Sequence, residues 1–169
     1  MNRLSPQFFI RDVLEVAPDL LGKILVRRFP DGQEMQFVIS ETEAYRGEED
    51  LACHASKGFT ERTKIMYLEG GHIYVYLIYG MYWMLNFVTS SENNPQAVLI
   101  RAFTSVNGPG RLTKTLGIDK SFNGENLSQS QRLFVCDNDL KISFRTAPRI
   151  GIDYAGKAWA NKPWRFILE

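Results

Sequence analysis

The segment of residues 71–86 constrains the fold of this chain more than any other. Apart from Gly71 and Gly80 it consists almost entirely of aromatic, β-branched and long apolar residues, a composition typical of β-strands. Gly80 interrupts this pattern, and glycine tolerates the positive φ that a tight turn requires. The segment therefore predicts a hairpin of two apolar strands that fold back at Tyr79, Gly80 and Met81.

Such a hairpin would carry large apolar side chains at its tip, where polar residues are the rule. Exposed apolar surface of this kind usually marks a contact site. One structure that a protruding aromatic side chain can enter is the gap between stacked bases in the minor groove of a nucleic acid. Core packing and binding of another partner are the alternatives.

Composition limits the class of protein. A chain of 169 residues that is 44% hydrophobic can bury the core of one domain, which we place at residues 1–169. No run of about 18 apolar residues is present, so no membrane span is expected. Residues 1–6 lack the apolar core of a signal peptide, and Cys53 and Cys136 are expected as free thiols. These features predict an intracellular protein, located in the cytoplasm or nucleoid if the source is bacterial.

Charge is nearly balanced, with a formal net charge of +1. Residues 1–60 contain seven Lys and Arg against ten Asp and Glu, whereas residues 61–169 contain thirteen against nine. The second part could therefore form a modest cationic face.

Strand patterns dominate the rest of the chain. Besides the hairpin, strands are expected at residues 23–29, 35–45, 97–103, 140–144 and 164–168, and helices at residues 12–21 and 111–116. Short turns such as Pro30-Asp31-Gly32 separate several of them. We predict an α+β fold with a curved, mainly antiparallel, barrel-like sheet, peripheral helices and a protruding β-hairpin.

Two carboxylates follow one of the apolar strand patterns. Because side chains alternate along a strand, Glu41, Glu43 and Tyr45 are expected on one face, together with Phe37 and Ile39. A carboxylate that continues an apolar face is costly to bury and would have a perturbed pKa. The plainer alternative is that the strand emerges into water here.

Other polar residues lie at the ends of apolar runs. A buried Arg101 is expected to pair with a carboxylate or to act in a site, and a buried Asn86 must find hydrogen-bond partners in the protein or in a ligand. His54 considered alone is more often structural than catalytic. Cys53, His54 and His72 lack the spacing of zinc ligands, so no metal is expected.

The tyrosines of the hairpin divide by position. Tyr74 and Tyr76 are expected on one face of a strand, where phenol rings can stack on a flat base or pack in the core, and core packing is favoured for Tyr74. Tyr79 falls at the turn. No Gly-rich phosphate loop and no nucleophile-elbow serine is present.

Read together, these motifs resemble the alkyladenine DNA glycosylases, also called the methylpurine or 3-methyladenine DNA glycosylases of the mammalian type. The resemblance covers nearly the whole chain and suggests a compact bacterial member. The matching residues are Phe8-Phe9, Leu21-Gly22, Leu25-Val26-Arg27-Arg28, Glu41-Thr42-Glu43-Ala44-Tyr45, Glu49-Asp50, His54, Tyr74-Val75-Tyr76, Ile78-Tyr79-Gly80-Met81-Tyr82, Asn86, Arg101, Gly108-Pro109, Lys120-Ser121-Phe122, Arg149-Ile150-Gly151 and Lys162-Pro163. This chain differs from the familiar family form at Trp83-Met84-Leu85.

The resemblance implies a catalytic centre. Glu43, the second glutamate of its motif, would accept a proton from the water that attacks C1′ and would stabilise the oxocarbenium-like sugar. Arg101 and the backbone carbonyl of Ile150 would hold that water. Arg101 would also keep Glu43 ionised.

The resemblance also implies residues that bind DNA. Tyr45 would lie on one side of a flipped purine, and Tyr76 with His54 on the other. Asn86 would collide with the exocyclic amine of guanine. In a separate role, Tyr79 would fill the space that the flipped nucleotide leaves, and Met81 would press on neighbouring bases or backbone. Two DNA-intercalating residues are therefore expected at the hairpin tip.

The function predicted is that of a monofunctional DNA glycosylase of base excision repair. It would hydrolyse the N-glycosidic bond of alkylated or deaminated purines (3-methyladenine, 7-methylguanine, hypoxanthine, ethenoadenine) in double-stranded DNA. It would need no cofactor, act as a monomer away from membranes, and leave an abasic site without lyase activity. A non-catalytic nucleic-acid-binding module and a nucleoside hydrolase are the alternatives, and only the latter would work without the Tyr79 wedge.

Overall fold

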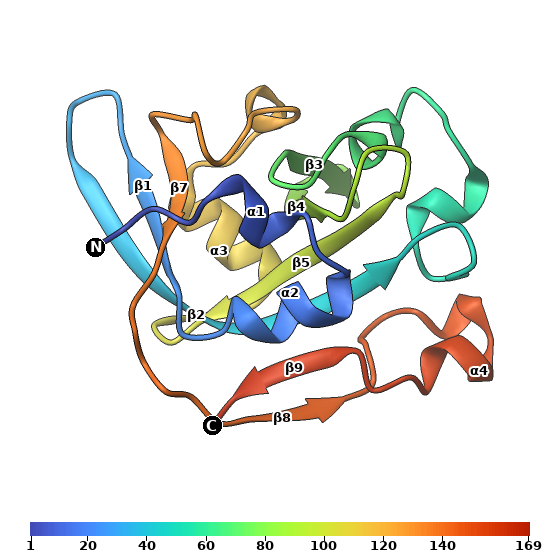
Figure 1. Cartoon of the computed structure of the whole chain (residues 1–169). Coiled ribbons are helices and arrows are strands. Elements are labelled where there is room, and N and C mark those ends of the chain that lie inside the picture. The colour runs from blue at the N-terminus through green and yellow to red at the C-terminus, as the bar shows by residue number, and fades with distance from the viewer.

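Strand β2 (Glu34–Arg46) organises the fold because it pairs with three other strands (Figure 1). Its first half pairs with β1 (Ile24–Arg28), and its second half pairs with β9 (Arg165–Leu168) on the same edge. Strand β5 (Gln96–Phe103) runs along the opposite edge. All three pairings are antiparallel in this computed structural model, which describes residues 1–169.

The sheet continues outward on both sides in the order β3-β4-β5-β2-β1-β7 and does not close into a barrel. The short strands β6 and β8 pair with β5 and β9, respectively. The predicted antiparallel α+β fold is thus confirmed, with an open sheet. The remaining strands are β3 (Ile73–Ile78), β4 (Tyr82–Thr89), β6 (Val106–Asn107), β7 (Leu133–Cys136) and β8 (Phe144–Ala147).

Short helices lie around the sheet, as predicted. Helix α2 packs on β2 and β5, and α3 packs on β4 and β5 (Figure 1). The side chain of Asp12 caps α2 by accepting a hydrogen bond from the Leu14 N–H at 2.9 Å. No helix combines the length and apolarity needed to cross a bilayer. The α-helices are α1 (Pro6–Phe9), α2 (Val13–Asp19), α3 (Pro109–Leu116) and α4 (Lys157–Ala160), and the 3₁₀ helices are His54–Lys57, Lys64–Tyr67, Lys120–Phe122 and Asp153–Ala155.

The prediction of a strand at residues 140–144 is wrong. Only Phe144 belongs to a strand, β8, and the strand before it is β7, which pairs with β1. The chain turns directly after β7, where Asp137 accepts backbone hydrogen bonds and Asp139 adopts a φ of 49°. A residue with positive φ cannot continue an extended strand. The strand pattern therefore breaks before residue 140.

The shared face expected for Phe37, Ile39, Glu43 and Tyr45 is also wrong, because β2 is irregular between Ile39 and Thr42. Phe37 and Ile39 belong to the main core, but beyond the irregularity Ala44 faces that core. Glu43 and Tyr45 consequently lie on the opposite face. A bulge shifts the alternation of side chains in this way, and this one occurs where β2 changes partner from β1 to β9.

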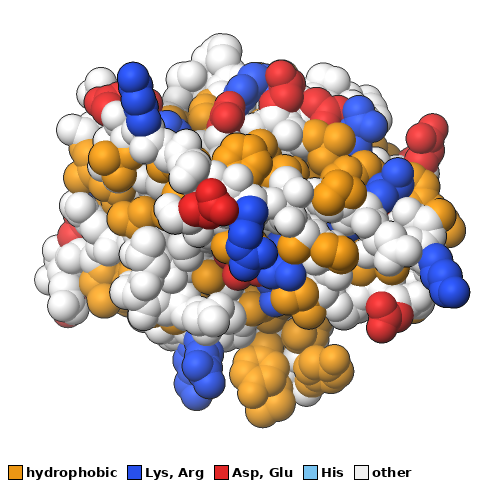
Figure 2. Space-filling view, turned by 90° about the horizontal axis from the view of Figure 1, so that it is seen from below, with side chains coloured by type: hydrophobic (Ala, Val, Ile, Leu, Met, Phe, Trp, Pro, Cys, Tyr) orange, Lys and Arg blue, Asp and Glu red, His pale blue; other side chains and the backbone are white.

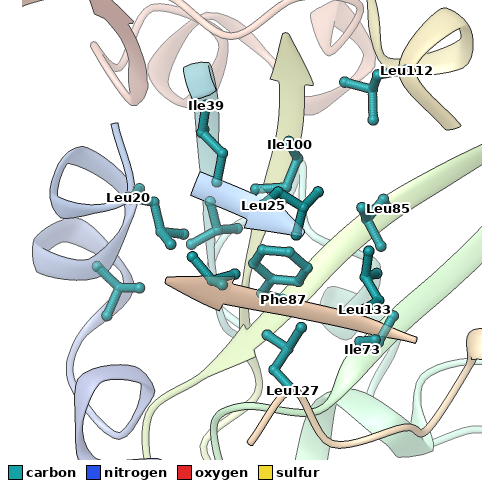
Figure 3. Packing of buried hydrophobic residues seen from close by; sticks show 14 of the residues in the cluster. Leu20, Leu25, Ile39, Ile73, Leu85, Phe87, Ile100, Leu112, Leu127 and Leu133 are labelled. Carbon is teal, nitrogen blue, oxygen red and sulfur yellow. The ribbon is translucent and has the colours of Figure 1, made fainter. Parts of the chain in front are cut away.

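The main core fills the space between the sheet and helices α1, α2 and α3. Phe87 of β4 lies at its centre, surrounded by leucine and isoleucine side chains from strands, helices and loops (Figure 3). The labelled members of this cluster are Leu20, Leu25, Ile39, Ile73, Leu85, Ile100, Leu112, Leu127 and Leu133. This packing fixes β2, β4 and β5 relative to one another and leaves their other face free to line a cavity.

Candidate active site

A cavity of about 430 Å³ opens on the face of β2, β4 and β5 opposite the main core. The hairpin β3–β4 forms one wall, and the segment after β8 forms another. Of the predicted site residues, the wall includes Tyr45, His54, Tyr76, Tyr79, Asn86, Arg101 and Ile150. Glu43 lies behind the wall, and Met81 lies outside it, 64% exposed at the hairpin tip.

Glu43 is held in a fully buried position by two donors. Arg101 Nη1 donates to Oε1 at 2.8 Å, and the backbone N–H of Ile150 donates to Oε2 at 2.9 Å. Each carboxylate oxygen can still accept another hydrogen bond. The structure brings the N–H of Ile150, not its carbonyl, to Glu43.

The electrostatics of Glu43 differ in one respect from the expectation. Burial raises the pKa of Glu43 above its usual value, and Arg101, the Ile150 N–H and Arg149 offset this rise only in part. Arg101 does favour the ionised carboxylate, as expected, but desolvation is the larger effect. A carboxyl with a raised pKa is suited to accept a proton near neutral pH.

A second carboxylate shares Arg101. Glu41 Oε1 lies 3.4 Å from Arg101 Nε, too poorly aligned for a hydrogen bond, and accepts one from Arg165 Nη1 at 3.0 Å. Arg165 also donates from Nε to the carbonyl of Pro148 at 2.8 Å. Sequence reasoning did not identify Arg165, since it lies in the closing strand, which pairs with β2 only in the folded chain.

Aromatic rings form much of the cavity wall. The rings of His54 and Tyr76 are 4.4 Å apart between centroids, inclined at 65°. His54 Nδ1 is 2.9 Å from the hydroxyl of Tyr74. Burial, assisted by the charge of Arg62, lowers the pKa of His54 to about 4, so the imidazole is neutral at neutral pH. Tyr74 is buried, which confirms the expected core packing, and it also supports His54.

Asn86 is buried in the cavity wall with its amide nitrogen already engaged. Nδ2 donates to the carbonyls of Tyr74 and Met84, at 3.2 and 3.4 Å. These two bonds restrain the side chain and leave the amide oxygen without a protein partner. The site thus presents a fixed acceptor at this point of the wall.

The hairpin turns as predicted, with Met81 N–H donating to Ile78 O at 3.1 Å. Both central residues have positive φ, 51° for Tyr79 and 65° for Gly80, as a type I′ turn requires. Positive φ is unusual for a tyrosine. The Tyr79 side chain is 87% exposed while still lining the mouth of the cavity. Figure 2 shows hydrophobic side chains projecting from one margin of the molecule, with Lys and Arg side chains closer to the middle of that face.

Sequence reasoning missed other residues around the cavity. Tyr154, 71% exposed, lines the mouth and donates its hydroxyl hydrogen to Ala52 O at 3.0 Å. Asp50 and Arg149 form a buried ion pair behind the site. Both of the latter lie in motifs that carry the family resemblance, which could have drawn attention to them, whereas nothing in the sequence distinguishes Tyr154.

Comparisons with known proteins find relatives over nearly the whole chain. The family model described as methylpurine-DNA glycosylase matches residues 7–107 and 104–169. A protein of Methanocella arvoryzae is 45% identical over 98% of this chain and 92% of its own length, and one of Bdellovibrio bacteriovorus is 46% identical over 98% and 95%. A protein of Desulfitobacterium hafniense is 43% identical over 100% and 96%. All three carry the provisional name 3-methyladenine DNA glycosylase.

Proposed function

This chain belongs to the methylpurine-DNA glycosylase family, and we propose that it is a monofunctional DNA glycosylase that excises alkylated or deaminated purines from duplex DNA. One observation carries the proposal. A buried carboxylate, Glu43, is held by Arg101 and the Ile150 N–H behind the wall of an aromatic cavity, whose mouth carries an exposed tyrosine of a protruding hairpin. This arrangement suits base flipping followed by hydrolysis of an N-glycosidic bond.

In the reaction, Glu43 acts as the general base. A water molecule attacks C1′ of the flipped nucleotide and gives a proton to Glu43, while the bonding electrons of the N-glycosidic bond leave with the base. The negative charge of Glu43 also stabilises the oxocarbenium-like sugar. Arg101 and the Ile150 carbonyl orient the water. No amine of the protein attacks the sugar, so the product is an intact abasic site.

The cavity selects the base. Tyr45 packs on one side of the purine, and Tyr76 with His54 on the other. A neutral His54 adds no repulsion toward a positively charged ring such as 3-methyladenine or 7-methylguanine. The restrained Asn86 collides with the exocyclic amine of guanine, an amine that hypoxanthine and ethenoadenine lack. In 7-methylguanine, which carries the same amine, the positively charged ring compensates because it is a better leaving group.

The hairpin opens the duplex. Tyr79 enters the base stack in place of the flipped nucleotide, and Met81 beside it contacts the neighbouring bases or backbone. The protein acts as a monomer on DNA, inside the cell, without a cofactor. Tyr79 belongs both to the exposed tip and to the cavity mouth, and this position supports a wedge beside a pocket for the base.

The experiment is a base-release assay on duplexes containing hypoxanthine, ethenoadenine or 7-methylguanine, with undamaged DNA as control. We expect single-turnover excision by the wild type and a rate about 10²- to 10⁴-fold lower for Glu43→Gln, the range that a general base alone contributes. Glu43→Gln should still bind damaged duplex. Full excision by this variant would refute the mechanism, and binding without any release by the wild type would favour a non-catalytic module.

A further inference from the structure

The buried pair Asp50–Arg149 lies behind the cavity and contributes no atom to its wall. Both side chains are 0% exposed. Arg149 Nη1 donates to Asp50 Oδ2 at 2.6 Å, and Nη2 donates to Oδ1 at 3.0 Å, so the pair is bidentate. Nothing in the reaction described above uses either residue.

The pair joins three chain segments, each of which carries a residue of the site. Arg149 Nη1 also donates to the carbonyl of Ala44, between Glu43 and Tyr45. Asp50 accepts backbone hydrogen bonds from Arg46 and Ala52, at 3.0 Å each, in the loop that leads to His54. Arg149 itself precedes Ile150. The pair therefore ties β2, this loop and the segment after β8 together.

Two contacts connect Arg149 to the reacting groups. The next peptide N–H, that of Ile150, donates to Glu43 Oε2 at 2.9 Å. The guanidinium carbon of Arg149 lies 4.9 Å from the centroid of the Tyr45 ring. A displacement of Arg149 would thus move both a donor to the catalytic carboxylate and the support of a base-binding ring.

A buried ion pair is a costly way to join segments, because the desolvation of two charges can exceed their attraction. Apolar side chains of similar size would hold the segments together as well or better. They could not, however, keep a fixed positive charge near Glu43 or restrain the peptide of Ile150 through a planar fork. The geometry therefore favours a role in the site over one in stability.

We propose that Asp50 and Arg149 are positioning residues, which hold the Ile150 N–H against Glu43 and keep that carboxylate able to ionise. The inference rests on the proposed glycosylase function. Arg101 of β5 and the Ile150 N–H contact Glu43, and the other titratable groups that interact with this site are Arg149, the phenols of Tyr45, Tyr76 and Tyr154, and Glu41, which shares Arg101. Of these, only Arg101 and Arg149 carry a positive charge.

The test is to follow the side-chain carboxyl of Glu43 by ¹³C NMR titration, in the wild type and in Arg149→Met and Arg149→Lys. The Glu43 signal is assigned by its loss in Glu43→Gln. We expect the pKa of Glu43 to rise further in Arg149→Met, and the acid limb of the excision rate to move to higher pH with it. Single-turnover rates should fall by about tenfold to a hundredfold, the cost of a small misplacement in a site.

Arg149→Lys keeps the charge but not the fork, so its carboxyl should titrate closer to the wild type while excision remains slow. Arg46→Met is the matched control, because it removes the exposed ion pair between Arg46 and Asp12 at the end of β2, the strand that carries Glu43. It should leave the titration and the rate unchanged. A lower melting temperature of Arg149→Met with an unchanged Glu43 titration and acid limb would show a purely structural pair and overturn the proposal.

A further variant covers the case in which Arg149→Met does not fold. Replacing Ile150 with its α-hydroxy acid analogue keeps the side chain and replaces the N–H that donates to Glu43 by an ester oxygen, so it should raise the pKa of Glu43. An unchanged titration here would also overturn the proposal. The titration needs no substrate, so a wild type that releases no base would refute the proposed function while the titration still decides the role of the pair.

Discussion

Tyr79 combines an unfavourable backbone conformation with an exposed side chain, and this combination predicts a conflict between stability and function. Its φ of 51° lies in the left-handed region, which costs an L residue with a Cβ roughly 1–2 kcal/mol. Its ring, 87% exposed, recovers little of that cost by burial. Strain maintained at an exposed tip is typical of a functional position.

We therefore compare Tyr79→Gly with Tyr79→Ala. Glycine relieves the strain but loses about 0.5–1 kcal/mol through the greater freedom of the unfolded chain. Tyr79→Gly should consequently be more stable than Tyr79→Ala by about 0.5–1 kcal/mol, or about 1–4 °C in melting temperature for a chain of this size. Urea unfolding with linear extrapolation measures the difference.

Activity should not follow this order of stability. Both variants lose the wedge, so excision of ethenoadenine from duplex DNA should be slower in both. The activation free energy should rise by no more than the few kcal/mol of one unstacking step. Gly80→Ala is the matched control, because its φ is 65° and an added Cβ meets nothing within 4 Å. It should lose stability through strain alone while keeping the wedge.

Two results would refute this reasoning separately. If Tyr79→Gly proves less stable than Tyr79→Ala, the tip is not strained in the way that its φ indicates. If both variants excise damaged bases from duplex DNA at the wild-type rate, Tyr79 is not a wedge.

Other predictions concern pH, packing and salt. Folding lowers the pKa of His54 from 6.5 to about 4, so the contribution of the neutral imidazole to stability is complete above pH 6.5 and is lost as the pH falls toward 4. The fall in unfolding free energy between these two pH values should therefore be smaller in His54→Gln. Gly110→Ala places a Cβ 2.9 Å from Tyr82 Cδ1, where α3 meets the hairpin, and should cost about 1–3 kcal/mol in urea unfolding despite the better helix propensity of alanine; wild-type stability would show that the ring yields freely. With a net charge of only +1, DNA affinity should fall moderately with salt, and a log–log slope as steep as that of a strongly basic repressor would contradict this.

The sequence predicted features that depend on neighbours along the chain. The hairpin and its turn follow from an aromatic run broken at Gly80, and the strands around β2 follow from apolar patterns between turn residues. The site residues came from a family resemblance, and the structure brings seven of them to one cavity. Their roles in catalysis and binding stay predictions.

Features that depend on residues far apart in the chain could not be predicted from the sequence. Strand β7 forms because Leu133–Cys136 finds β1, more than a hundred residues earlier in the chain, while residues 140–143 find no strand partner. The face of β2 that carries Glu43 was misjudged because a bulge forms where the strand changes neighbours. The alternation of apolar and polar residues along one strand does not show where a neighbouring strand ends, and therefore does not show where a bulge will form.

The opening segment shows the same division. By itself the sequence determined an apolar hairpin with a tyrosine at its tip, since strand and turn preferences act over a few residues. Only the tertiary structure decided that Glu43 is fully buried, paired with Arg101 and bonded to the Ile150 N–H, because these contacts join residues 58 and 107 positions apart. Burial and long-range contacts set the pKa of that carboxyl, and so its chemistry.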